Sequence, residues 1–202
     1  YAMQFLGPPF TFGVNLVSEN TTIMGPLSAV AVEDNVFWMG LKEFYVYGGT
    51  VQRLPCTVRD YVFDDFNLLQ REKVVAATNT AFSEIWWFYP SESSDTNDRY
   101  VVYNYEQQVW YYGALARSYW MDRGIFDNPI AAGPNNYLYT QESGFDDDGS
   151  ALTAYIESSQ MDIGDGEQFA FIKRMIPDLT FRGSTADSPS ANLTVKTRNF
   201  PG

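Results

Sequence analysis

The chain has 202 residues, of which 45% are hydrophobic and 17% aromatic, so it can bury a sizeable core and is not a disordered segment. Its 13 basic and 25 acidic residues give a formal net charge of −12, which disfavours binding to nucleic-acid phosphates or to an anionic membrane. Histidine is absent and Cys56 is the single cysteine, which excludes Ser/His and Cys/His nucleophiles and an intrachain disulfide. No apolar run approaches the length of about 18 residues that a transmembrane helix needs, so no membrane span is predicted.

Residues 1–10 contain neither an initiator Met nor a signal-peptide pattern, and we expect the chain to be a fragment of a longer protein. From residue 29 onward, short apolar or alternating runs are separated by turn residues such as Gly48-Gly49. These runs predict four strands, at 29–32, 36–39, 44–47 and 50–54. Residues 58–72 then place apolar side chains at helical spacing, which predicts one short amphipathic helix as a connector.

A second group of strands is predicted after this helix, at 73–77, 84–89, 99–103 and 108–112. It repeats the first group, because 36–39 aligns with 85–88 at an offset of 49 residues and 44–47 with 100–103 at an offset of 56. The polar residues 90–97 account for the difference between the two offsets and are predicted to form a surface loop.

A third unit is predicted from strands at 129–132 and 136–140, about 51 residues after the second aromatic strand. A four-stranded unit that recurs near every 50 residues is typical of a β-propeller blade, and closing a propeller takes about four to eight blades. We therefore expect residues 1–149 to be part of a β-propeller whose other blades precede Tyr1. The longer alternating segments at 152–157, 168–176 and 191–197 predict a C-terminal antiparallel sheet or sandwich-like segment over 150–202, in a chain that is all-β.

The acidic turn 146–149 invites interpretation as a calcium loop, with Asp146 and Asp148 as candidate ligands. An EF-hand alternates its ligands and needs a distant Glu, whereas these aspartates are adjacent along the chain and point in different directions. A solvated acidic turn is therefore the preferred interpretation, and neither a metal nor a cofactor is expected.

A second acidic turn contains Asp162, Asp165 and Glu167 and is interpreted as a hairpin turn. Its functional alternative is an acidic patch that faces a lumen containing DNA, since negative charge repels a polyanion that must slide past without binding.

A carboxylate pair for glycoside hydrolysis would combine Glu84 with Asp95 or Asp98, but the sequence does not determine their separation. Trp86 and Trp87 point to opposite faces of one strand, so at most one of them could line a sugar platform. Burial between blades is the preferred interpretation of both. No enzymatic activity is predicted.

Several aromatic strand motifs resemble those of bacteriophage virion proteins described as packaged-DNA stabilisation or tail-nozzle (tail tubular) proteins of short-tailed phages. The motifs are VFWMG at 36–40, FYVYGGTVQRLPC at 44–56, EIWWFY at 84–89, DRYVVYN at 98–104 and VWYYG at 109–113, and the stretches 156–166, 174–178 and 195–198 fit the same pattern. The resemblance covers most of the chain and includes no catalytic motif.

This resemblance implies a propeller-bearing subunit of a homo-oligomeric ring, a hexamer, below the portal and adaptor, with tail spikes or fibres as further partners. The ring would retain packaged DNA and form the conduit for its ejection without binding DNA tightly. The protein would be assembled in the bacterial cytoplasm and located in the virion tail. Net acidity, a low cysteine content and aromatic-rich strands agree with that role.

Two alternatives remain open. A carbohydrate-binding or glycan-cleaving propeller that acts in receptor recognition is suggested by four tryptophans, Trp86, Trp87, Trp110 and Trp120, and it predicts Trp side chains exposed at the rim of a pocket. A generic scaffold propeller that recruits protein partners is not distinguished from the tail protein by the sequence.

Overall fold

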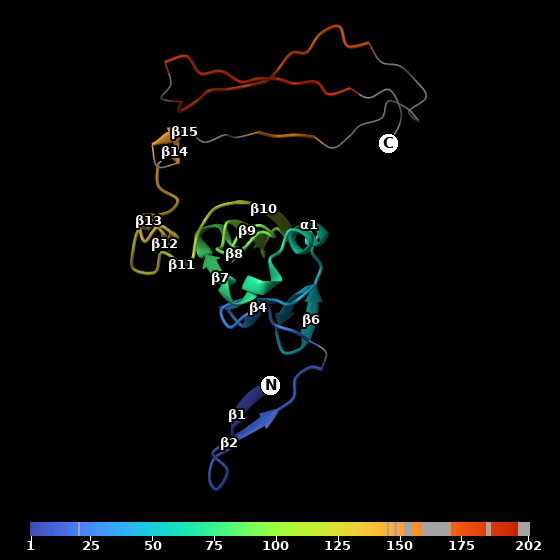
Figure 1. Ribbon diagram of the computed structural model, residues 1–202, viewed down its shortest axis with the longest axis vertical. Coiled ribbons are helices and arrows are strands. Elements are labelled where there is room, and N and C mark those ends of the chain that lie inside the picture. The colour runs from blue at the N-terminus through green and yellow to red at the C-terminus, as the bar shows by residue number, and fades with distance from the viewer. Residues whose placement is uncertain are drawn as a thin grey trace. The chain divides into compact units, whose positions relative to one another are not determined.

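The protein is described by a computed structural model over residues 1–19, 21–144, 146–147, 149–151, 155–158, 171–184 and 187–197 (Figure 1). The chain divides into two compact units, Tyr1–Phe145 and Asp146–Gly202, and each is described by itself. The described strands form five sheets with antiparallel pairing between neighbours, which confirms the predicted β class. No helix in the described ranges is long and apolar enough to cross a lipid bilayer.

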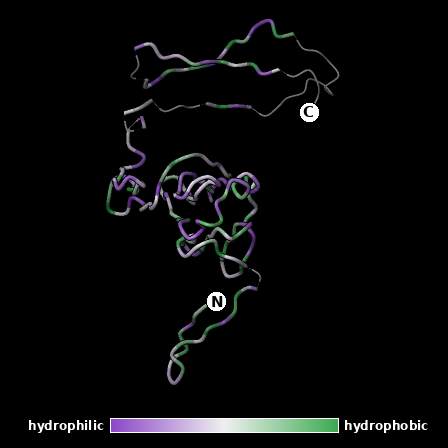
Figure 2. Tube along the Cα trace, in the orientation of Figure 1, coloured by the Kyte–Doolittle hydropathy of each residue, from purple (hydrophilic) through white to green (hydrophobic). Residues whose placement is uncertain are grey.

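The first unit begins with a two-stranded hairpin, β1 (Ala2–Phe5) and β2 (Phe12–Asn15). Met3 pairs with Val14 and Phe5 with Phe12, so these four apolar side chains share one face of the hairpin. All four are between 58% and 69% exposed. Figure 2 shows hydrophobic residues along both strands. A two-stranded hairpin with an uncovered apolar face is only marginally stable on its own.

Next comes the first sheet, four antiparallel strands paired in chain order. Its strands are β3 (Ala29–Val32), β4 (Asn35–Met39), β5 (Phe44–Tyr47) and β6 (Val51–Leu54). The four predicted strands are therefore confirmed to within one residue at each end. Gly49, with a φ of +92°, supplies the positive φ that the turn between β5 and β6 requires.

The connector is not the single helix predicted over 58–72. It consists of a one-and-a-half-turn helix, α1 (Arg59–Asp64), and a 3-10 segment, η1 (Leu68–Lys73). The break lies at Asn67, whose side-chain oxygen accepts from the Leu69 N–H at 3.1 Å and whose own N–H donates to the Pro90 carbonyl at 3.1 Å. Phe66, beside it, is 6% exposed and belongs to the core. Local side-chain capping and burial of Phe66 thus override the helical periodicity.

The second sheet repeats the first, with four antiparallel strands paired in chain order. Its strands are β7 (Val75–Asn79), β8 (Glu84–Tyr89), β9 (Arg99–Asn104) and β10 (Val109–Ala114), and the short 3-10 segment η2 (Thr80–Phe82) joins β7 to β8. The aligned register of the repeat is confirmed, because Met39 pairs with Phe44 as Phe88 pairs with Tyr100.

The segment 90–97 between β8 and β9 is only partly the surface loop that was predicted. Ser91 and Asn97 are 2% and 4% exposed. The Asn97 amide donates to the Lys73 carbonyl at 2.7 Å, and the Asn67 amide donates to the Ser94 carbonyl at 2.9 Å. The loop is therefore packed against the connector, and its polar composition serves these hydrogen bonds as well as solvent contact.

A third sheet has three strands, β11 (Tyr119–Met121), β12 (Ile130–Ala132) and β13 (Leu138–Thr140). The strands predicted at 129–132 and 136–140 exist, but they are the second and third of this sheet. The prediction that the unit starts at residue 129 is wrong, because β11 precedes it. Only Trp120 is buried in this three-residue strand, which is too short for its alternation to be recognised in the sequence.

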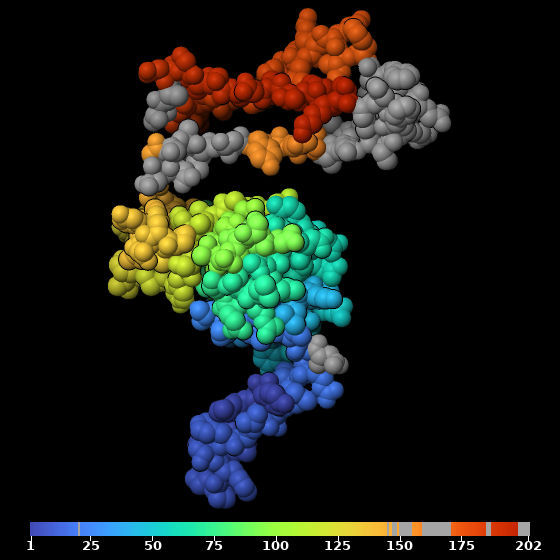
Figure 3. Space-filling view, viewed as in Figure 1, coloured from blue at the N-terminus to red at the C-terminus, as the bar shows by residue number. Residues whose placement is uncertain are grey.

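The three sheets pack through two separate apolar cores. Figure 3 shows the outer surface of the residues that form these sheets, from blue through green to yellow. Between the first and second sheets lie Phe37, Met39, Phe44, Ile85, Trp87 and Val101, among others. Between the second and third sheets lie Ala77, Trp86, Phe88, Val102, Trp120 and Ala131. The first strands of successive sheets are neighbours, β3 beside β7 and β7 beside β11. The described sheets form neither a closed barrel nor a closed propeller.

In the second unit, the described residues contain one short hairpin, β14 (Asp146–Asp147) and β15 (Ser150–Ala151). The ranges 155–158, 171–184 and 187–197 contain no strand, in contrast to the strands predicted within 152–157, 168–176 and 191–197, whose remaining residues lie outside the described ranges. Alternation alone does not form a strand, because the backbone groups need a paired neighbour. Phe171 and Val195, which the pattern would bury, are 84% and 45% exposed.

Candidate assembly surface and polar clusters

Trp38 and Trp87 occupy equivalent positions in the first two sheets, 49 residues apart. Trp87 is fully buried between the sheets, and its indole N–H donates to the Ser28 carbonyl of the preceding repeat at 3.0 Å. Trp38 also donates to a preceding backbone carbonyl, that of Thr22, at 3.0 Å, but its side chain is only partly buried. The same strand position is thus covered by a sheet in one repeat and not in the other.

The side of the first sheet that carries Trp38 faces away from the second sheet. We call it the open face and define it by the strand residues Val36, Trp38, Tyr45, Tyr47 and Val51, which share one side of the sheet by register. Trp38 and Tyr45 stack at 5.3 Å between ring centroids. Val36 is 36% exposed, whereas its equivalent in the second sheet, Ile85, is fully buried.

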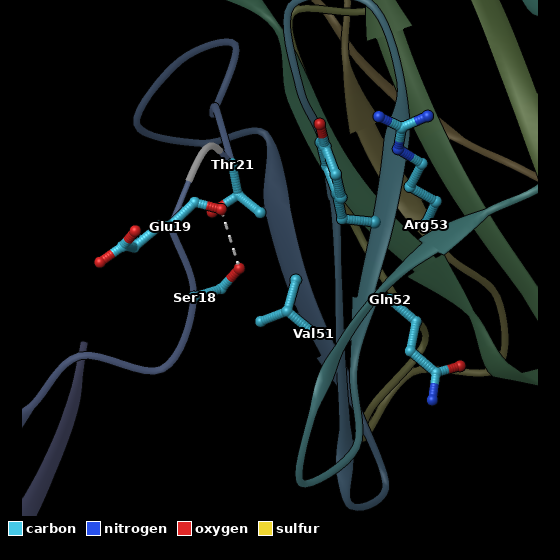
Figure 4. Close-up of a pocket in the computed structure, with 7 residues that line it drawn as sticks. Ser18, Glu19, Thr21, Val51, Gln52 and Arg53 are labelled. Atoms are coloured by element: carbon cyan, nitrogen blue, oxygen red, sulfur yellow. Dashed lines mark hydrogen bonds between the residues drawn. The ribbon is translucent and has the colours of Figure 1, made fainter.

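Two pockets lie along the open face. The larger, of about 350 Å³, is bordered by the residues Tyr1, Ala2, Val17, Ser18, Thr21, Val36, Trp38, Tyr47 and Val51. A second, of about 220 Å³, lies where Ser18, Glu19 and Thr21 oppose β6, and Figure 4 shows these three residues across from Val51 and Arg53. Among the described residues that border the two pockets, Glu19 and Arg53 have charged side chains, and both line the smaller pocket. The larger pocket has a mainly apolar and aromatic lining, which suits recognition of an apolar or aromatic group, whereas the smaller pocket is lined mostly by polar side chains.

A matching face lies at the other end of the stacked sheets. The residues Tyr119, Met121 and Leu138 share one side of the third sheet, opposite Trp120 and Ala131. They are 53%, 45% and 75% exposed, and we call this side the end face. The first and third sheets therefore each carry apolar side chains on the side that faces away from the second sheet.

A polar cluster attaches the third sheet to the second. Asp122 accepts from the Thr78 hydroxyl at 3.1 Å and from the Thr80 N–H at 3.0 Å, and the Trp120 indole donates to the Thr78 carbonyl at 3.0 Å. Partial burial opposes ionisation of Asp122, but the hydrogen bonds that its carboxylate accepts outweigh this effect and hold its pKa below the ordinary value.

Glu142 lies near the same junction and accepts from the Asn79 amide at 3.3 Å. Partial burial of its carboxyl group and the neighbouring charge of Glu84 raise the pKa of Glu142. The folded state therefore favours the ionised form of Asp122 and the protonated form of Glu142, so the two groups contribute to stability with opposite pH dependence.

Glu84 is not brought together with Asp98. Glu84 pairs with Asn104 at the start of β8, whereas the Asp98 N–H donates to the Tyr89 carbonyl at the strand's other end. Five residues along a strand place the two carboxylates on the order of 17 Å apart, beyond the roughly 5–10 Å of glycosidase pairs.

These carboxylates instead have separate structural contacts. Glu84 accepts from the Trp86 indole at 2.9 Å and from the Tyr111 hydroxyl, whose pKa is raised by burial and by this contact. Asp98 accepts from the Ser91 N–H and hydroxyl, both at 2.7 Å. Asp95 accepts from the Gln70 amide at 3.3 Å. None of these contacts forms the acid and base pair of a glycosidase.

The structure buries three of the four tryptophans that suggested a sugar platform. Trp86, Trp87 and Trp120 are 8%, 0% and 4% exposed and lie between sheets, so no sugar ring can stack on them. Trp110 is partly buried and donates to the Pro55 carbonyl at 2.8 Å. The partly exposed Trp38 was not among the candidates, although the offset of 49 residues identifies it as the counterpart of Trp87.

Asp146 accepts from the Gly149 N–H at 3.1 Å, as expected for a turn, and the other candidate ligand, Asp148, lies outside the described residues. Asp162, Asp165 and Glu167 also lie outside them. Within the described part of the chain, no group of three or more acidic or Cys side chains is placed to hold a metal ion. Cys56 packs against the first core, where burial raises the pKa of its thiol to about 11.

A scan against protein-family models finds no match to the chain, and a search of curated proteins likewise finds no match.

Proposed function

We propose that this chain is a structural subunit of a bacteriophage tail, in a nozzle or hub ring that retains packaged DNA and forms the conduit for its ejection. The observation that supports it best is the stacking of successive meander sheets through aromatic faces, with their first strands side by side. That arrangement is typical of β-propeller blades, which give a rigid frame for a ring subunit.

The polar groups of the first unit support a structural role. Asp122, Asp98 and Glu84 are engaged in hydrogen bonds that tie sheets and loops together. With a formal net charge of −12, the chain repels a passing polyanion and gives it few cationic contacts. A conduit for DNA needs this combination of rigidity and weak attraction.

The motifs that resemble nozzle proteins form the stacked strands themselves. VFWMG at 36–40 and EIWWFY at 84–89 lie in the second strands of the two four-stranded sheets, and DRYVVYN at 98–104 contains the third strand of the second sheet. On this proposal the ring meets the portal and adaptor on one side and tail spikes or fibres elsewhere, and the protein is located in the virion.

Immunogold electron microscopy tests this function. An antibody raised against the chain is applied to particles purified from lysates that contain the protein, with pre-immune serum as the control. We expect gold label at the distal tail. Particles that contain capsid and tail but bind no label would overturn the proposal.

A second candidate is binding of a glycan at the open face, favoured by the stacked Trp38 and Tyr45 beside a pocket of about 350 Å³. The Trp38 ring, which is partly exposed, could offer one flat apolar face to a sugar ring, with the buried Tyr45 ring stacked beside it. A glycan array distinguishes this candidate, because binding must be lost in Trp38→Ala and retained in Trp110→Phe, at a ring that packs against the first core and away from the open face. An array without hits removes this candidate.

A further inference from the structure

We propose that Tyr61 and Tyr112 form a site of oxidative cross-linking, at which a peroxide-derived one-electron oxidant joins the two phenol rings as dityrosine. The bond would link α1 covalently to β10, the last strand of the second sheet. The inference goes beyond the proposed function and does not depend on it, because both residues belong to the first unit of the chain itself.

The two rings are stacked, with 3.9 Å between their centroids and 28° between their planes. At that separation, facing carbon atoms of the two rings are in van der Waals contact. The other tyrosine rings of the first unit that contact a described aromatic ring have Phe or Trp partners. The stack of Tyr61 on Tyr112 therefore supplies both halves of a dityrosine bond at one place in the fold.

Both sides of the stack are held in place by the first core. Val62, next to Tyr61, is fully buried there and anchors a helix that is too short to be stable by itself. On β10, Trp110 packs against the same core, and its indole N–H donates to the Pro55 carbonyl at 2.8 Å. Tyr112 lies two residues further along, on the same side of the strand. Packing of the connector on the second sheet thus fixes the two phenol rings against each other.

The reaction is a two-electron oxidation of the pair. Each tyrosine gives up one electron and its phenolic proton and becomes a tyrosyl radical. The radicals combine through a bond between ring carbons adjacent to the hydroxyl groups. Each of these carbons then loses its hydrogen as a proton while the phenolic oxygen regains one, which restores both aromatic rings. One hydrogen peroxide accepts the two electrons and two protons and leaves as two water molecules.

The fold favours this bond over coupling between separate chains. Stacking holds the second phenol at a high effective concentration, so one radical meets the other within its own chain. A disulfide cannot join these elements, because Cys56 is the single cysteine. The dityrosine bond would close a loop that contains η1 and the strands β7, β8 and β9, which restricts the unfolded chain and should stabilise the fold.

Oxidation of the purified 202-residue chain tests the proposal, with a small haem peptide and hydrogen peroxide as the oxidant and protein at low micromolar concentration. We expect dityrosine fluorescence in protein of monomer mass. Mass spectrometry should find tryptic peptides joined through Tyr61 and Tyr112, with the loss of two hydrogen atoms. Tyr61→Phe and Tyr112→Phe each retain the ring and remove the phenol, so each should lose most of this fluorescence. Tyr119→Phe, at a tyrosine on β11 outside the stacked pair, is the matched control and should retain it.

Unfolding separates proximity in the fold from ordinary tyrosine reactivity. In urea the stack is lost, so the same oxidation should no longer join Tyr61 to Tyr112 within one chain. Oxidised monomer without dityrosine, or monomer fluorescence that persists in both phenylalanine variants, overturns the proposal. Because the measurement uses purified protein, its outcome is independent of whether immunogold places the chain in a tail.

Discussion

The indole N–H of Trp87 donates to the carbonyl oxygen of Ser28 at 3.0 Å, and both residues are fully buried. The Ser28 carbonyl also accepts from the Met39 N–H at 3.1 Å, while the Ser28 hydroxyl donates to the Gly25 carbonyl at 2.8 Å. One residue therefore connects the start of β3, the end of β4 and the second sheet. The hydrogen bond ties the two four-stranded sheets together through their shared core.

Trp87→Phe should destabilise the protein more than Trp38→Phe. The change at Trp87 removes the hydrogen bond to Ser28 and leaves a cavity in the first core, for a loss of about 2–4 kcal/mol. Trp38 is only partly buried, so loss of its hydrogen bond to Thr22 and of part of its ring should cost roughly 1 kcal/mol. Urea unfolding followed by circular dichroism measures both, and equal losses would contradict the distinction between covered and open faces.

Asn97→Ala should cost about 1–2 kcal/mol in the free energy of unfolding, because it leaves the Lys73 carbonyl without its donor at 2.7 Å in a site where Asn97 is 4% exposed. Ser93→Ala, at an exposed position of the same loop, is the control and should change stability by less than about 0.5 kcal/mol. Thermal or urea unfolding compares them. Similar effects from both changes would show that the loop is not anchored through Asn97.

Asp122→Asn should lower stability at neutral pH, by roughly 1 kcal/mol, and have a smaller effect in acid. The pKa of Asp122 is lowered in the folded state, so its carboxylate stabilises the fold above the unfolded pKa of about 4, and this contribution is lost as the pH falls through the folded pKa. The difference between wild type and variant, measured by urea unfolding from pH 7 to pH 3, should therefore shrink on acidification.

Glu142→Gln should have the opposite effect on stability at neutral pH. The pKa of Glu142 is raised in the folded state, so its contribution is fully present below the unfolded pKa and is lost as the pH rises through the folded pKa. The variant should be the more stable protein at pH 7, and the two should converge in acid. A variant that is less stable than wild type at pH 7 would contradict this assignment.

Cys56 should react slowly with thiol reagents in the native protein. Burial raises the pKa of its thiol to about 11, so little thiolate is present at pH 8. Labelling with a chromogenic disulfide should be at least about tenfold slower in native protein than in urea, where the thiol titrates near its ordinary pKa of about 8.5. Equal rates would show that the thiol is not held against the first core.

Strand positions in the first unit were predictable because their physical cause is local. Alternating apolar residues bounded by Gly, Asn and Asp identify β3 to β10 within about two residues, and the offsets of 49 and 56 residues match the pairings Met39 with Phe44 and Phe88 with Tyr100. The connector departs from its periodicity because Asn67 bonds to Pro90, a partner far along the chain that no local pattern includes.

Which aromatic side chains lie on the open face was harder to predict from the sequence. The composition and the repeat determined by themselves that the chain is β-rich, acidic and built from recurring aromatic strands. The tertiary structure alone decided which aromatic rings are covered, since Trp38 and Trp87 have the same local context and differ only in whether another sheet packs on them. Burial depends on contacts between segments distant in the chain, and a local sequence pattern specifies which side of a strand is apolar but not what covers it.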